Sequence, residues 1–338
     1  MDKLTLIRRM ALFATFLALV VVLLGAWTRL SEAGLGCPDW PGCYGFLTVP
    51  QHDHHIQQAE EAFPHAPFEE HKAWPEMIHR YFAGSLGLVI LAIFVVALAA
   101  GRQGPRLHAG ALLALVVFQA YLGMLTVTAM LHPVIVMGHL LGGFSIVCLL
   151  GLLYLRLHPS PPFIRSFCSS TIVSRLGWLA LVIVIVQIAL GGWTSANYAA
   201  VVCTSLPICE GDWLSTYHFV TGFWFSGYEA DTYQYGVLPF EGRLTIHVTH
   251  RIGAIIAACA VIALVIGLWK RSSKSLATLL LAVLCAQIAL GVTNVLAALP
   301  LAVAVSHNGG GLLLLFSIIV VLFLTNRVGA KEENANGC

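Results

Sequence analysis

The chain has 338 residues, of which 58% are hydrophobic and only 10% carry a charged side chain. Soluble domains contain about 45–50% apolar and about 25% charged residues, so this composition excludes an ordinary water-soluble fold. The net charge of +2 does not indicate a nucleic-acid partner, and lipid is the solvent that such a surface requires.

Eight apolar runs follow one another along the chain, each with about the 20 residues that a helix needs to cross a bilayer. They cover approximately residues 10–30, 76–100, 108–129, 134–156, 175–196, 244–269, 276–298 and 302–325. Basic residues precede the first run, as in a signal peptide. Because that run is too long for a signal peptide and no small-residue cleavage site follows, we expect an uncleaved first helix.

The distribution of Lys and Arg predicts the topology. If the N-terminus is cytoplasmic, the even number of spans returns the C-terminus to the same side. The inner segments then hold 13 of the 18 basic residues: Lys3, Arg8, Arg9, Arg102, Arg106, Arg156, Arg165, Arg175, Lys270, Arg271, Lys274, Arg327 and Lys331. This positive-inside bias predicts two cytoplasmic termini. Since no Arg- and Ser-rich presequence is present, a bacterial inner membrane is expected.

Two outer loops each contain a pair of cysteines six residues apart, Cys37 with Cys43 and Cys203 with Cys209. In an oxidising compartment such pairs are most simply disulfides, and a metal site is the less favoured alternative. For the first pair, both a structural clip and a redox-active element remain open.

The first outer loop is also rich in histidine, with His52, His54, His55, His65 and His71. Tracts of this kind can bind metal. We favour a solvated segment with one amphipathic helix.

Ionisable residues inside the apolar runs are the strongest functional signal, because such residues are costly in hydrocarbon. Glu76 and His79 are three residues apart, so a helix places them on one face. Further histidines occupy three other runs, and all four lie about 6–12 Å inside the outer end of their helix at 1.5 Å per residue: His79, His139, His250 and His307.

Markers recur between the two halves of the chain. Trp27-Thr28 matches Trp193-Thr194 at an offset of 166, and both cysteine pairs share that offset. Gln119 and Gly123 match Gln287 and Gly291, His139 matches His307, and His79-Arg80 matches His250-Arg251.

The recurrence predicts an all-α membrane protein of two four-helix bundles, residues 1–157 and 175–338, joined by a cytoplasmic linker at 158–174. Since a four-helix unit leaves the membrane on the side where it entered, the bundles should be parallel repeats. A pseudo-two-fold axis along the membrane normal would relate them.

Each half therefore supplies two histidines at a similar depth. Two imidazoles facing each other inside a four-helix bundle can hold a haem iron from both sides. A single histidine would be better explained by a polar contact with a neighbouring helix, whereas two repeated pairs favour haem. Zinc would need more strong ligands, and only Glu76 lies at that depth.

These residues resemble a known family. Thr28-Arg29-Leu30, the segment 35–41 (LGCPDWP), the segment 76–80 (EMIHR) and the later His139, His250 and His307 are similar to haem A synthases along the whole chain. The resemblance implies oxidation of a methyl group of haem O to a formyl group by successive hydroxylations, giving haem A for terminal oxidases. It implies haem O bound in the N-terminal half and haem B, as cofactor, in the C-terminal half.

On this interpretation His79 and His139 bind the iron of haem O, and His250 and His307 bind the iron of haem B, both on the periplasmic side. Partners would include haem O synthase, cytochrome oxidase assembly factors and an unidentified electron acceptor.

The two halves differ three residues before the repeated histidine, where the first has Glu76 and the second has His247. Only the first site therefore has a carboxylate beside its haem, and a buried carboxylate can accept protons near neutral pH. We expect Glu76 to be catalytic, with an ion pair to Arg80 as the rival interpretation. His247 is expected to be a hydrogen-bonding neighbour of its site.

Three arginines near the outer ends of the helices, Arg29, Arg80 and Arg251, are candidates for binding haem propionates, because a guanidinium matches a carboxylate. Snorkelling of Arg80 and Arg251 to the lipid headgroups is equally compatible with their positions. The counterpart of Arg29 is Ser195, so this arginine is not shared between the halves.

Two other classes of function remain open. A di-haem b-type electron carrier would have the same ligands, although such a carrier usually needs its haems toward opposite faces. A transporter would be expected to have interrupted helices and polar groups near the midplane, whereas the polar residues here cluster toward the outer end.

Overall fold

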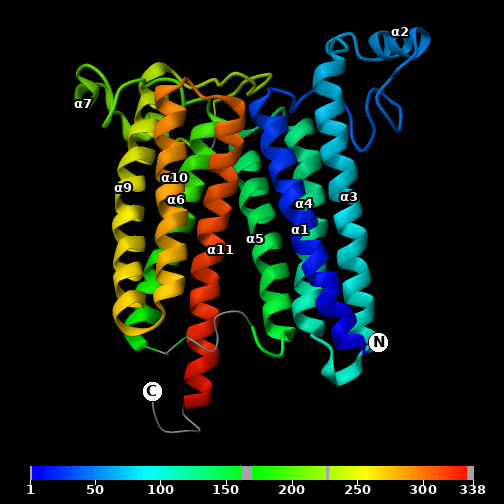
Figure 1. Ribbon diagram of the computed structural model, residues 1–338. Coiled ribbons are helices and arrows are strands. Elements are labelled where there is room, and N and C mark those ends of the chain that lie inside the picture. The colour runs from blue at the N-terminus through cyan, green and yellow to red at the C-terminus, as the bar shows by residue number, and fades with distance from the viewer. Residues whose placement is uncertain (1, 162–166, 168–169, 226–227, 333–338) are drawn as a thin grey trace. The chain divides into compact units, whose positions relative to one another are not determined.

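The computed structural model describes residues 2–161, 167, 170–225 and 228–332, without the side chains of 328–332. The structure is built from α-helices (Figure 1), and across these ranges the only β-type pairing is an isolated bridge between Cys43 and Phe46. Arg165 and the side chain of Lys331, both predicted to be cytoplasmic, lie outside the described residues.

In the described part of the chain, eight helices are long and apolar enough to cross a membrane, which confirms the eight predicted spans. They are α1 (Lys3–Leu30), α3 (Glu70–Ala99), α4 (Arg106–Thr128), α5 (Pro133–Leu157), α6 (Thr171–Ala196), α9 (Phe240–Arg271), α10 (Lys274–Leu296) and α11 (Leu301–Glu332). Short helices lie between them: α2 (Asp53–Ala62), η1 (Gly101–Gln103), α7 (Trp213–Thr216) and α8 (Phe219–Gly222).

All of the long helices begin earlier than predicted, and the largest difference is in α1, which starts at Lys3 instead of residue 10. Helix α3 starts at Glu70 instead of residue 76, and α9 starts at Phe240 instead of residue 244. Pro75 lies inside α3, in its second turn, where the missing backbone N–H removes one hydrogen bond of the helix. Its carbonyl accepts a hydrogen bond from the Thr28 hydroxyl at 3.2 Å.

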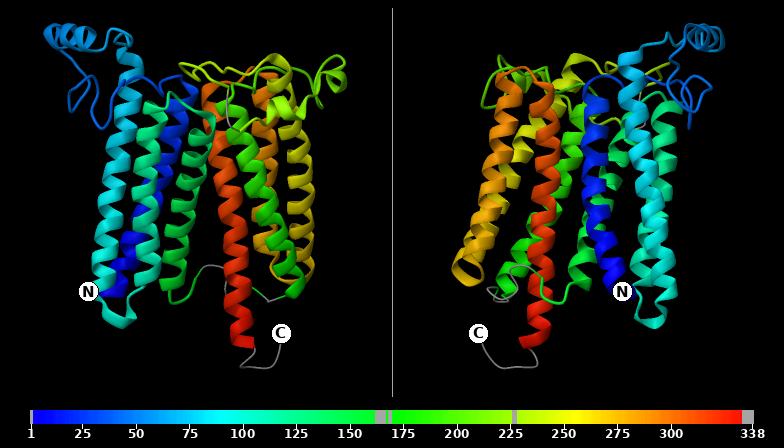
Figure 2. Two further views of the ribbon diagram at one scale, coloured as in Figure 1. Left: turned by 180° about the vertical axis from the view of Figure 1, so that it is seen from behind. Right: turned by 45° about the vertical axis from the view of Figure 1, so that its right-hand side comes forward.

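The chain forms two compact units. The first comprises Met1–Tyr154 together with Ala196–Tyr198 and Trp224–Leu238. The second comprises Leu155–Ser195, Ala199–Phe223 and Pro239–Cys338. In the first unit, α1, α3, α4 and α5 lie side by side in all views (Figures 1 and 2).

The two late segments of the first unit, Ala196–Tyr198 and Trp224–Leu238, will be called the strap. Strap residue Tyr233 donates its backbone N–H to the Met130 carbonyl at 3.0 Å, and its ring packs edge-on against His132 with centroids 4.8 Å apart. Tyr198 accepts a hydrogen bond from Arg29 at 2.8 Å. The strap thus contacts the ends of α1 and α4.

Helices α1 and α3 pack through matching stripes with helical spacing. The buried residues on α1 include Ile7, Ala11, Ala14 and Ala18, and those on α3 include Leu86, Ile90, Ile93 and Ala97. Small residues such as alanine let two helix backbones approach closely, which is the main source of helix association in lipid. The side chain of Lys3 ties the ends of the pair by donating to the Ala99 carbonyl at 2.7 Å.

Large apolar side chains project outward from the long helices. Phe13, Phe16 and Leu88 are 60%, 61% and 70% exposed. Apolar surface on this scale is a liability in water but suits a lipid-facing helix. The arrangement supports the membrane location inferred from composition.

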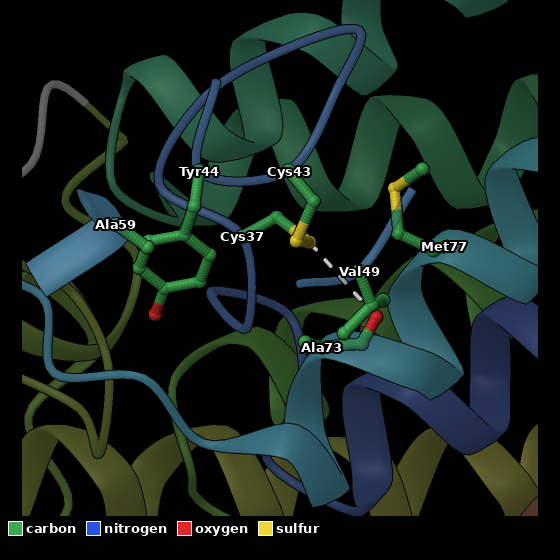
Figure 3. Packing of buried hydrophobic residues seen from close by; sticks show 7 residues of the cluster. All are labelled: Cys37, Cys43, Tyr44, Val49, Ala59, Ala73 and Met77. Carbon is green, nitrogen blue, oxygen red and sulfur yellow. Dashed lines mark hydrogen bonds between the residues drawn. A yellow bond between two sulfur atoms is a disulfide. The ribbon is translucent and has the colours of Figure 1, made fainter. Parts of the chain in front are cut away.

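The first outer loop has its own small apolar core, shown in Figure 3. Its buried members come from the loop, from α2 and from the start of α3: Cys37, Cys43, Tyr44, Val49, Ala59, Ala73 and Met77. Helix α2 contains His54 and His55 of the histidine-rich tract and buries only Ala59, as expected for an amphipathic surface helix. Among the described residues no group of three His, Cys, Asp or Glu is arranged to hold a metal ion.

The hydroxyl of Tyr44 predicts how this loop responds to alkali. It donates to the Pro67 carbonyl at 2.9 Å, and burial, followed by the charge of Glu69, raises the pKa of Tyr44 to about 12. The unfolded loop would ionise near pH 10, the folded loop near 12. Below pH 10 Tyr44 is protonated in both the folded and the unfolded loop, and its buried hydroxyl contributes its full share of loop stability. We therefore expect this share to be lost as the pH rises from about 10 to 12.

Difference absorbance of tyrosinate between wild type and Tyr44→Phe measures this step, and trapping of Cys37 and Cys43 with a thiol reagent after mild reduction reports loop opening. Ionisation of Tyr44 near pH 10 with the loop intact would contradict the prediction.

Candidate functional site

The first unit brings His79 on α3 and His139 on α5 together. Their ring centroids are 6.4 Å apart and the ring planes are nearly perpendicular, at 85°. The pairing follows from the chain path, because the helices that carry the two rings belong to the same four-helix bundle. The two histidines that were predicted to face each other therefore lie close together.

A glycine of the adjacent helix makes room for each ring. A Cβ atom on Gly25 of α1 would lie 2.9 Å from Cε1 of His79, and one on Gly123 of α4 would lie 3.4 Å from Cε1 of His139. In both cases the Cε1 edge faces the glycine, so the two ring nitrogens lie on either side of it.

The second unit shows the same arrangement. A Cβ atom on Gly191 of α6 would lie 3.2 Å from Cε1 of His250, and one on Gly291 of α10 would lie 3.1 Å from Cε1 of His307. His250 lies within electrostatic range of His307. All four predicted ligand histidines therefore have the same local packing.

The spacing of the first histidine pair fits an iron held between the two rings. Because a metal–imidazole bond is about 2 Å long and the nitrogen lies about 1 Å from the ring centre, two imidazoles on one metal have centres about 6 Å apart. The His79–His139 separation of 6.4 Å matches this value. Among the described residues, the Nδ1 atoms of His79, His139 and His307 are buried without a hydrogen-bond partner.

Glu76 lies one turn before His79 and is 5% exposed. Its Oε1 forms a salt bridge with Arg80 at 2.5 Å, and its Oε2 accepts the backbone N–H of Cys37 at 3.0 Å. The ion pair that rivalled the catalytic interpretation is therefore present. The Glu76 carboxylate therefore links helix α3 to the first disulfide loop.

Arg80 holds the same loop through its backbone. One terminal nitrogen of its guanidinium donates to the carbonyl of Asp39 at 3.0 Å and also to the carbonyls of Pro41 and Gly42. The other terminal nitrogen pairs with Glu76. This arginine therefore fixes the loop to α3 next to His79.

Arg251 performs the corresponding task in the second unit. It donates to the carbonyls of Ser205 at 2.6 Å and Cys203 at 2.7 Å, and also to that of Ile208. Its Nε donates to Nε2 of His247 at 3.2 Å. His247 is thus a hydrogen-bonding neighbour, as predicted, and it stands where the first unit has Glu76.

Arg29 lies near the end of α1 in the first unit. It donates to the Tyr198 hydroxyl at 2.8 Å and to the Ala196 carbonyl at 3.4 Å, and its guanidinium lies 4.2 Å from the centre of the Tyr198 ring. A cation over an aromatic face adds to the hydrogen bonds. The strap therefore binds Arg29 at the same end of the unit as the disulfide loop.

Both cysteine pairs form disulfides, as predicted. The S–S distance is 2.03 Å for Cys37–Cys43 and 2.15 Å for Cys203–Cys209. Each disulfide closes a loop that an arginine holds by hydrogen bonds. Arg80 of α3 holds the first loop, and Arg251 of α9 holds the second.

Sequence reasoning missed two features of the site. Gly25 and Gly191 were not singled out, although they share the offset of 166 that relates other markers; comparing all glycines at that offset would have found them. The strap residue Tyr198 has no signal in the sequence, because it lies 169 residues from Arg29.

The chain is similar to known proteins along most of its length. A family profile described as cytochrome oxidase assembly protein matches residues 8–319. The haem A synthase of Shewanella oneidensis is 48% identical over 324 residues, which cover 94% of this chain and 96% of that protein. The haem A synthase of Agrobacterium fabrum is 26% identical over 341 residues, covering 92% of this chain and 87% of the relative.

A third relative, the haem A synthase of Maricaulis maris, is 25% identical over 339 residues, covering 92% of this chain and 93% of its own. The similarity therefore extends over both units.

Proposed function

The chain belongs to the haem A synthase family, and from this premise we propose that it oxidises a methyl group of haem O to a formyl group, producing haem A. The observation that carries the proposal is the imidazole pair of His79 and His139, 6.4 Å apart, beside the buried carboxylate of Glu76. The second unit repeats the histidines but has His247 in place of the carboxylate.

We assign the substrate to the first unit and the cofactor to the second. His79 and His139 would bind the iron of haem O, while His250 and His307 would bind the iron of haem B. When bound, haem B supplies a redox-active iron that can accept and pass on electrons. A site that only holds a cofactor needs no carboxylate as proton acceptor, which accounts for His247 at the position of Glu76.

In this scheme Glu76 accepts protons or orients water while the methyl group is oxidised. Its salt bridge to Arg80 and the N–H of Cys37 fix the orientation of the carboxylate. A carboxylate held in one position beside the reacting carbon is the arrangement that general base catalysis requires.

The positive charges of Arg29, Arg80 and Arg251 gather at the ends of the units that carry the disulfide loops, where we place the haem propionates. By the positive-inside bias this end is periplasmic and both termini are cytoplasmic. Haem O synthase and oxidase assembly factors are the proposed partners.

Substitution of Glu76 tests the proposal. The full-length protein is expressed together with a haem O synthase, purified, and its haems are extracted and identified. We expect Glu76→Gln to keep haem B and haem O but to yield no haem A. Glu70→Gln is the matched control, because Glu70 lies on the same helix at an exposed position and accepts a hydrogen bond from Trp74.

Normal haem A production by Glu76→Gln would refute the catalytic role. Wild-type protein containing haem B alone would instead support an electron carrier, and protein without haem would support a transporter.

A further inference from the structure

We infer that Arg243, near the start of α9, binds a propionate of haem B in the second unit, and that Arg251 holds the disulfide loop instead. Apart from Arg243 and Arg251, the basic residues of this unit belong to the segments predicted to be cytoplasmic. The inference deepens the proposed function and rests on it, because it assumes that His250 and His307 bind a resident haem B.

Most donors of Arg251 are already engaged. Its Nε donates to His247, and its two terminal nitrogens donate to three backbone carbonyls of the disulfide loop. A guanidinium has five N–H groups, so these four bonds leave one. Arg251 also follows His250 directly and therefore lies about 100° from it round the helix. Its hydrogen bonds are spent on the loop, and a haem carboxylate needs another cation.

Two sides of the outer turns of α9 are covered by the chain itself. Leu244 and Val248 pack against the second disulfide loop. On the next side, the hydroxyls of Thr245 and Thr249 form hydrogen bonds of 2.8 Å and 3.0 Å with the turn between α7 and α8. Arg243 belongs to neither set, so its side of the helix is a third one.

That third side is the one that carries the ligand histidine. Arg243 lies seven residues before His250, which is about 10.5 Å along an α-helix and only about 20° round it. Propionates extend from the rim of a porphyrin, so a cation that pairs with them lies well away from the iron ligand along the helix. Arg243 meets this requirement, because it is two turns closer to the outer end than His250.

The charge of Arg243 has no partner within the described part of the chain. Its Nε is buried there without a hydrogen-bond acceptor, and none of the salt bridges includes it. A buried donor on a charged group is costly unless an acceptor satisfies it. A carboxylate from outside the chain would supply both the negative charge and the acceptor oxygens, and it matches the fork of a guanidinium.

The first unit shows what the chain does when such a cation has a protein partner. Matching the His-Arg pair of α3 with that of α9 places Lys72 opposite Arg243. Nζ of Lys72 forms a salt bridge with Glu69 at 2.9 Å, whereas Phe240 occupies the position of Glu69 in the second unit. The cation is therefore neutralised in the proposed substrate unit and left without a carboxylate in the proposed cofactor unit.

Release of haem B tests the inference. Full-length protein is purified with its haems, and transfer to excess apomyoglobin is followed by absorbance, with the haems identified after extraction. We expect Arg243→Gln to speed release of haem B about 10- to 100-fold, the factor that a hydrogen bond to a charged group provides. Arg243→Lys should recover part of the loss, because it keeps the charge but not the fork. Lys72→Gln is the matched control and should release haem B as wild type does.

The dimethyl ester of haem B shows whether the carboxylates are the partner. Haem-depleted protein is reloaded with haem B or with the ester, which has the same iron and ring but no propionate charge. Wild type and Arg243→Gln should release the ester equally fast, because the arginine then has no carboxylate to hold. If Arg243→Gln speeds release of the ester and of haem B by the same factor, Arg243 supports the fold or contacts a lipid headgroup, and the inference is wrong.

Thermal unfolding of the haem-depleted protein gives an independent readout. The substitution removes a charge that lacks a protein partner, so Arg243→Gln should unfold at the temperature of wild type or above it. A lower unfolding temperature would indicate a structural role and overturn the inference, as would wild-type release of haem B. The proposed function fails on a different result, namely wild-type protein without haem B or unchanged haem B in His250→Ala.

Discussion

Replacing Arg80 with alanine is expected to destabilise the first unit by about 3–5 kcal/mol, the range for breaking a buried ion pair. The side chains of Arg80 and Glu76 are only 12% and 6% exposed, so the substitution leaves an uncompensated carboxylate in a buried position. It also removes the donors of three loop carbonyls. Thermal unfolding in detergent measures the loss, and trapping of Cys37 and Cys43 after mild reduction measures release of the loop.

A second variant separates charge from packing. The double variant Arg80→Met with Glu76→Gln removes both charges of this buried pair. It should therefore be more stable than Arg80→Ala, because the effects of two interacting residues are not additive. Arg102→Ala, at an exposed position in η1, is the surface control. If Arg80→Ala unfolds at the same temperature as wild type and its disulfide stays protected from reduction, the arginine does not hold the loop.

Adding one methyl group at Gly25 is expected to weaken binding of haem O by about tenfold or more. A Cβ atom there would lie 2.9 Å from Cε1 of His79, so the ring must shift, and overpacking of this kind costs about 1–3 kcal/mol. Haem content after extraction measures the effect, with haem B in the second unit as an internal standard.

Glycines along the same bundle provide graded controls. Gly123→Ala should have a smaller effect, because its Cβ would lie 3.4 Å from His139, and Gly84→Ala should have none, because its Cβ would meet nothing within 4 Å. Equal haem O content in Gly25→Ala and Gly84→Ala would mean that His79 does not need the space at Gly25.

The spans, and the histidines that lie inside them, could be predicted because both depend on local chemistry. A run of about 20 apolar residues has few alternatives to a membrane helix, and a histidine within it needs a reason to be there. The disulfides followed from a six-residue spacing. The start of α3 was misplaced because the prediction followed the apolar run, whereas the helix continues back through charged residues such as Glu70 and Lys72.

The contacts around the histidines could not be predicted in the same way. The repeat offset marks a glycine such as Gly25, but its role appears only when the ring of the neighbouring helix is placed. The hold of Arg80 and Arg251 on the loops depends on backbone carbonyls, which every residue has. Arginine at these positions therefore suggested propionates or headgroups, and the path of the loop was needed to find the carbonyls.

The strap also bears on how the chain is made. Ribosomes deliver the N-terminal unit first, yet Tyr198 and Tyr233, which bind its outer end, are translated after α6, a helix of the other unit. The N-terminal unit therefore cannot be completed during synthesis until α6 has been inserted, so the two units mature in an interleaved order and not one after the other.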